Sequence, residues 1–146
     1  MTERFARIGL AVTAIWLYNW CLVRVIGVAV ALPFPSWWFQ VVPRSDHGIL
    51  AWVILCHTTA VVVVALPFAW LFSTHYRRYA MPLACVAAWI IAIPVMAQTL
   101  RYLPHMSGLM RGVNILDTVK VVAALPLLTL VFRHRSLTHV GADRDG

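Results

Sequence analysis

The stretch GILAWVILCHTTAVVVVALPFAWLF, which runs from Gly48 to Phe72, decides the fold, because it is long, apolar and free of Asp, Glu, Lys and Arg. The hydrocarbon core of a bilayer is about 30 Å thick, and a helix needs about 20 apolar residues to cross it. The stretch lacks the alternation of apolar and polar residues that is typical of a barrel strand. Only a helix satisfies all backbone groups of a single segment inside lipid. The sequence therefore predicts a transmembrane helix here.

Three more apolar segments meet the same length, and Pro or Arg residues separate them. The four predicted helices cover residues 8–32, 48–72, 81–103 and 113–132. We expect one integral membrane domain, 1–146, that is all-α: a four-helix transmembrane bundle of up-down-up-down topology. Residues 133–146 are expected to form a short cytoplasmic tail.

The composition agrees with a membrane protein and argues against a soluble one. Hydrophobic residues make up 62% of the chain and charged residues only 12%, whereas soluble domains have about 25% charged residues. The net charge is +7, but the basic residues lie mostly at the ends of apolar runs, where orientation signals are expected. Nucleic acid is therefore not a predicted partner.

The arginines predict the orientation of the chain in the membrane. Three arginines lie in the first and third connections, namely Arg44, Arg101 and Arg111. Seven lie in the N-terminus, the second connection and the C-terminal tail, namely Arg4, Arg7, Arg77, Arg78, Arg133, Arg135 and Arg144. The positive-inside rule then predicts that both termini are cytoplasmic. Compactness and short loops suggest a bacterial inner membrane.

The first helix and the connection after it each allow two interpretations. Ala29–Ala31 is similar to a signal-peptide cleavage site, but Asn19, Trp20 and Arg24 interrupt the apolar run, so an uncleaved helix is favoured. The connection contains Trp37, Trp38 and Phe39 and is expected to lie flat in the outer interface as an aromatic anchor. The alternative is a partner-docking loop, since aromatic residues dominate interface hot spots.

Polar residues within the spans form the candidate binding site, because each ionisable residue there costs about 2.5–3.5 kcal/mol on insertion scales. At about 100° per residue, polar or small residues share one face in the first, third and fourth helices, and we expect these faces to point inward. The predicted cluster comprises Arg24, His57, Gln98, Arg101, Asn114, Asp117 and Lys120. His57 is expected near the middle of its helix, and the others toward the outer leaflet.

Two residues of this predicted cluster lead to more specific expectations. Arg24 and Asp117 lie at nearly equal depth, so we expect them to form an ion pair. The remaining positive charge would then suit an anionic headgroup, a small anion or an acidic partner segment. His57 is interpreted as a structural histidine, with a proton relay or a haem ligand as alternatives.

Chemistry-bearing motifs are weak throughout the chain. Weak candidates for a metal site are His105, Met106 and Met110, because thioether and imidazole groups hold Cu(I). No carboxylate pair, phosphate loop or catalytic triad is evident, and the single cysteines Cys21, Cys56 and Cys85 form no CxxC pair. We therefore predict no cofactor, and no catalytic residue is assigned.

Three functions remain open at this point. The first is a non-enzymatic interaction, accessory or immunity-type membrane protein that binds a membrane-protein partner or itself. The second is an oligomeric transporter or channel for a small solute, with an anion as one option. The third is a membrane enzyme that acts on lipid or quinone.

Overall fold

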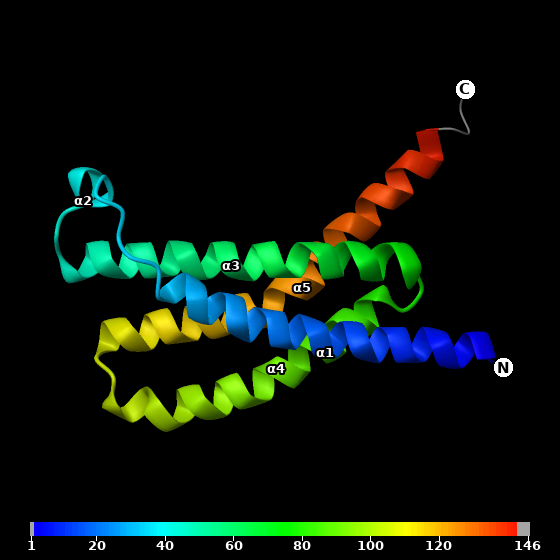
Figure 1. Cartoon of the computed structure of the whole chain (residues 1–146), viewed down its shortest axis with the longest axis horizontal. Helices are drawn as coiled ribbons and strands as arrows, with labels where there is room; N and C mark the ends of the chain where they lie inside the picture. Colours follow the sequence, from blue (N-terminus) through cyan, green and yellow to red (C-terminus); the bar gives the residue numbers. More distant parts are fainter. Residues whose placement is uncertain (1, 143–146) are drawn as a thin grey trace.

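The computed structural model describes residues 2–142, and all regular structure within that range is helical (Figure 1). The helices are α1 (Thr2–Val30), α2 (Trp38–Val41), α3 (Asp46–His75), α4 (Ala80–Tyr102), the 3-10 helix η1 (Leu103–His105) and α5 (Gly108–Ala142). The four long helices are apolar and long enough to cross a membrane, over Phe5–Val30, Asp46–His75, Ala80–His105 and Gly108–His134. The prediction of four membrane-spanning helices is confirmed.

Consecutive long helices run in opposite directions (Figure 1). The start of α1 and the connection between α3 and α4 therefore lie at one end of the molecule, which we call the terminal half. The α2 helix and the connection between α4 and α5 lie at the other end, which we call the α2 half. Helix α5 continues through most of the predicted tail to Ala142, and residues 143–146 lie outside the described residues.

Helix α3 is central, because it packs along both α1 and α5, and α5 in turn packs along α4. Small side chains permit close approach, as is typical of helix packing in membranes. Ala65, Ala69, Ala84 and Ala87 are all fully buried. Larger side chains fill the space between the alanines, and Tyr18, Leu22, Phe72 and Leu125 are also fully buried. This apolar core extends from the middle of the molecule into the terminal half.

The predicted inward face of the first helix is wrong. Residues on that face are all exposed: Gly9, Thr13, Trp16, Trp20, Arg24, Gly27 and Ala31. The buried face of α1 instead carries Ala14, Tyr18 and Leu22. Tyr18 and Trp20 are two positions apart, which is about 200° around a helix, so they point to opposite sides. Small and polar residues do not identify the buried face of α1, because the interior accepts larger apolar side chains equally well.

Candidate functional site

Helices α3 and α5 bring four polar side chains together in the α2 half, directly beyond the apolar core. Asp117 Oδ1 lies 2.6 Å from Lys120 Nζ and 3.3 Å from His57 Nδ1. Lys120 Nζ donates a hydrogen bond of 2.9 Å to Thr58 Oγ1. The Thr58 hydroxyl donates in turn to the carbonyl of Ile54, at 2.6 Å. We call these residues, His57, Thr58, Asp117 and Lys120, the polar cluster.

The polar cluster is largely enclosed by the protein. The His57 side chain is only 9% exposed, against 22% for Asp117 and 18% for Lys120. Asp117 Oδ1 and His57 Nδ1 are both buried atoms, and they lie in ion-pair contact with each other and, for Asp117, with Lys120. Burying a carboxylate beside an ammonium group limits the cost of placing either one in the membrane.

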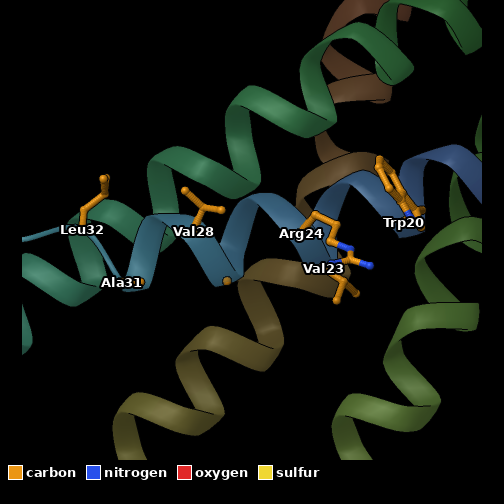
Figure 2. A pocket seen from close by; sticks show the side chains of 7 residues that line it. Trp20, Val23, Arg24, Val28, Ala31 and Leu32 are labelled. Atoms are coloured by element: carbon orange, nitrogen blue, oxygen red, sulfur yellow. The ribbon is translucent and has the colours of Figure 1, made fainter.

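The expected ion pair between Arg24 and Asp117 is wrong. Asp117 contacts Lys120 and His57, and the Arg24 guanidinium lies over the ring of Trp20, 5.7 Å from its centroid. Figure 2 shows Arg24 and Trp20 on the same stretch of α1. Arg24 and Asp117 do not pair because Arg24 points away from the bundle. Leu22, two positions earlier, is buried, and a residue two positions along a helix lies on nearly the opposite side.

The exposed face of α1 is hollowed around Arg24. The hollow is lined by residues of α1 and of the two positions that follow it, namely Trp20, Val23, Arg24, Gly27, Val28, Ala31 and Leu32 (Figure 2). A Cβ atom added at Gly27 would meet nothing within 4 Å. The packing of this chain therefore does not explain the glycine, although glycine costs a helix interior about 1 kcal/mol relative to alanine.

The predicted inward stripe of the third helix is also wrong, and the prediction for the fourth is confirmed. Gln98 and Arg101 are exposed on α4, whose buried face carries alanines and Ile91 instead. Asn114, Asp117 and Lys120 are half-buried on α5, as expected. The Asn114 amide donates to Met106 Sδ at 3.4 Å. The predicted site thus divides into an enclosed polar cluster and two exposed regions.

Threonines supply links that the sequence analysis missed. Thr58 binds Lys120, and the hydroxyls of Thr99 and Thr118 lie 3.3 Å apart between α4 and α5. Threonine is common in transmembrane helices, where its hydroxyl bonds the carbonyl four residues earlier, as Thr118 does with Asn114. The sequence therefore does not distinguish a threonine that also contacts a second helix from one that bonds only within its own helix.

The aromatic connection after α1 is folded against the start of α3. Trp38 is buried, and its indole N–H donates a 3.1 Å hydrogen bond to the carbonyl of Gly48. Its ring packs on that of Trp52, with 5.1 Å between the ring centroids. Phe39 is half-buried beneath the Arg44 guanidinium, and Trp37 is 53% exposed. Of the three residues in the predicted docking loop, Trp37 therefore presents the most free surface.

The weak metal candidates lie around η1. His105 and Met110 are exposed and Met106 is half-buried. Within residues 2–142 no group of three or more His, Cys, Asp or Glu side chains is arranged to hold a metal ion. The thioether of Met106 is occupied by the Asn114 hydrogen bond.

Comparison with known proteins adds no assignment, since no family model, curated protein or solved structure matches the chain. The four apolar helices define the class: this is a small multi-pass membrane protein. Any more specific function has to be inferred from the placement of its side chains.

Proposed function

We propose that this protein is an accessory or interaction protein of the bacterial inner membrane, and that the exposed α1 face around Arg24 binds a transmembrane helix of another protein. The observation that carries the proposal is the position of Arg24. It lies within a membrane-spanning segment, on the outside of the molecule, and has no ion pair among the described residues.

An arginine in this position needs a partner. A charged side chain in a span costs about 2.5–3.5 kcal/mol on insertion scales and ordinarily faces protein or water. The stacking on Trp20 offsets part of that cost, since cation–π contacts contribute about 0.5–2 kcal/mol. A carboxylate on a neighbouring helix would supply the missing charge.

The shape of the face fits a helix. Gly27 and Ala31 are four positions apart, which is the small-xxx-small spacing that lets two helices approach closely in membranes. Both are exposed, and Trp20 borders the same hollow; Ala31 lies one residue beyond the end of α1. The bound segment is therefore expected to pack its backbone against Gly27 and Ala31 while its acidic side chain meets Arg24.

A second copy of this chain is a poorer occupant. Two copies inserted in the same direction would form a two-fold interface, in which the same patch meets itself. Arg24 would then face Arg24, and like charges repel each other. The charge of the face thus favours a different protein with an acidic residue in its membrane span.

Site-specific photo-cross-linking in native membranes tests the proposal. A cross-linking residue replaces Val28, at the rim of the hollow, and a matched control replaces Val63, which is 58% exposed on α3. We expect a protein adduct from position 28, lipid adducts alone from position 63, and at least a tenfold loss of the protein adduct when Arg24→Gln is added. Lipid adducts alone at both positions, or a product containing two copies of this chain, would overturn the proposal.

Oligomeric transport remains the second candidate, supported by the Asp117–Lys120 pair within a span. Flux through liposomes that is abolished by Asp117→Asn would favour transport over the interaction role.

A further inference from the structure

A groove in the terminal half lies between the start of α1 and the connection from α3 to α4. Its volume is about 750 Å³, and its lining comes from α1, from residues 75–79 and from the first turn of α4. The Tyr76 hydroxyl donates a 2.9 Å hydrogen bond to the carbonyl of Arg7, 69 positions earlier in the chain. This bond fixes one wall of the groove to the other.

The groove is basic at its rim. Arg7, Arg77 and Arg78 all line it. Arg7 forms an ion pair of 2.8 Å with Glu3, both side chains being exposed, and such surface pairs contribute about 0–1 kcal/mol. No ion pair between described residues involves Arg77 or Arg78. Two neighbouring guanidinium groups without a carboxylate suit a phosphate, which they bind through paired N–H donors.

The other part of the groove is apolar. Ile8, Ala11 and Leu83 line it, and all three belong to segments that span the membrane. The connection at residues 76–79 lies between the spans Asp46–His75 and Ala80–His105, so the arginines lie at the membrane surface. The groove therefore runs from the headgroup level into the hydrocarbon.

We propose that this groove binds an anionic glycerophospholipid, with its phosphate on Arg77 and Arg78 and an acyl chain along Ile8, Ala11 and Leu83. Two other ligands fit the groove less well. A free anion would contact only the basic rim and leave the apolar part unused, and a zwitterionic lipid would bring its own positive charge toward the three arginines. A basic pocket between transmembrane helices is a recognised form of site for anionic headgroups. The site is distinct from the α1 face around Arg24 and does not depend on the proposed partner.

Native mass spectrometry of the purified full-length protein tests the site. The probes are phosphatidylglycerol, phosphatidylcholine with the same acyl chains, and inorganic phosphate. The test variant is Arg77→Gln/Arg78→Gln. The control is Arg44→Gln/Arg111→Gln, which removes equal charge at the opposite end of the molecule.

We expect the wild type to retain phosphatidylglycerol at least tenfold better than phosphatidylcholine. The double variant should bind phosphatidylglycerol roughly 25-fold more weakly, since each surface arginine contributes about a fivefold factor. The control should stay within twofold of wild type.

Equal binding of the two lipids by the wild type, or unchanged binding by the double variant, would overturn the proposal. Displacement of the lipid by excess inorganic phosphate would show a free-anion site and would overturn it as well. The comparison of the three probes uses the wild type alone, so it decides the matter even where a variant folds poorly.

Discussion

The two halves of this molecule use different means to hold helices together. From the middle into the terminal half, α3 and its neighbours meet through small side chains such as Ala69 and Ala84, with Phe72 filling the remaining space. In the α2 half, α3 and α5 meet through the polar cluster, and α1 presents its charge on the outside. A membrane protein gains nothing from water exclusion between its helices, so close packing and polar contacts are the alternatives. Close packing needs no charged group, whereas each charged side chain in the α2 half needs a partner, and Arg24 has no ion pair among the described residues.

Truncation of a large, fully buried aromatic side chain should have the greatest effect on stability. Phe72→Ala opens a cavity at a fully buried position. We expect a loss of about 3 kcal/mol, the lower end of the range for Phe→Ala in protein cores, because the lipid-embedded reference state removes the water-transfer contribution. Reversible unfolding in mixed micelles measures it. Trp89→Ala, at an exposed position on α4, is the control and should change stability by less than about 0.5 kcal/mol.

Breaking the polar cluster should cost somewhat less, and restoring neutrality should recover part of the loss. Asp117→Asn leaves Lys120 charged and unpaired in the membrane, which we expect to cost about 2.5 kcal/mol. Adding Lys120→Gln removes the lone charge. In a double-mutant cycle the double variant should be more stable than Asp117→Asn alone. Additive losses would show that the 2.6 Å contact carries no coupling energy.

Gly48→Ala should destabilise the α2 half alone. A Cβ atom at Gly48 would collide with the carbonyl oxygen of Pro43, and this backbone atom cannot rotate away. We expect a cost of about 1–3 kcal/mol, as for other overpacked sites, together with a change in the fluorescence of Trp38, which binds the Gly48 carbonyl. Gly112→Ala, where the added atom meets nothing within 4 Å, should leave the Trp38 fluorescence unchanged and should not lower stability, because alanine replaces glycine inside a helix.

The exposed face of α1 should give the smallest effect on stability. Gly27→Leu fills open space and removes the cost of a glycine inside a helix, so the unfolding free energy of the purified protein should stay the same or rise by up to about 1 kcal/mol. The same substitution should abolish the cross-link from position 28, because a leucine prevents close approach of a second helix. A stability loss like that of Phe72→Ala would show that α1 packs within its own chain through this face.

The sequence predicted the spans well and the helix faces poorly, for one physical reason. Length and hydropathy identify a span because the bilayer imposes both. Which side of a span faces its neighbours depends on side-chain shape, since lipid and protein interior are similarly apolar. Tyr18 and Leu22 therefore gave no sign that they are buried, and Arg24 gave no sign that it is exposed. On α5 the prediction was correct. Asp117 and Lys120 are one turn apart, and the free-energy cost of exposing their charges to lipid places both side chains on the inward face. The links through Thr58 and Thr99 required the three-dimensional arrangement.

The accessibility of position 27 to lipid tests the central claim most directly. A spin label is attached at Gly27→Cys in a variant in which Cys21, Cys56 and Cys85 are replaced by alanine. The collision rate of the label with dissolved oxygen is measured in native membranes and again after purification into lipid nanodiscs. We expect the label to be protected in native membranes and freely accessible once the protein is alone. A label at Val63→Cys should be accessible in both. Equal, high accessibility of position 27 in both preparations would contradict the account, because the α1 face would then meet only lipid.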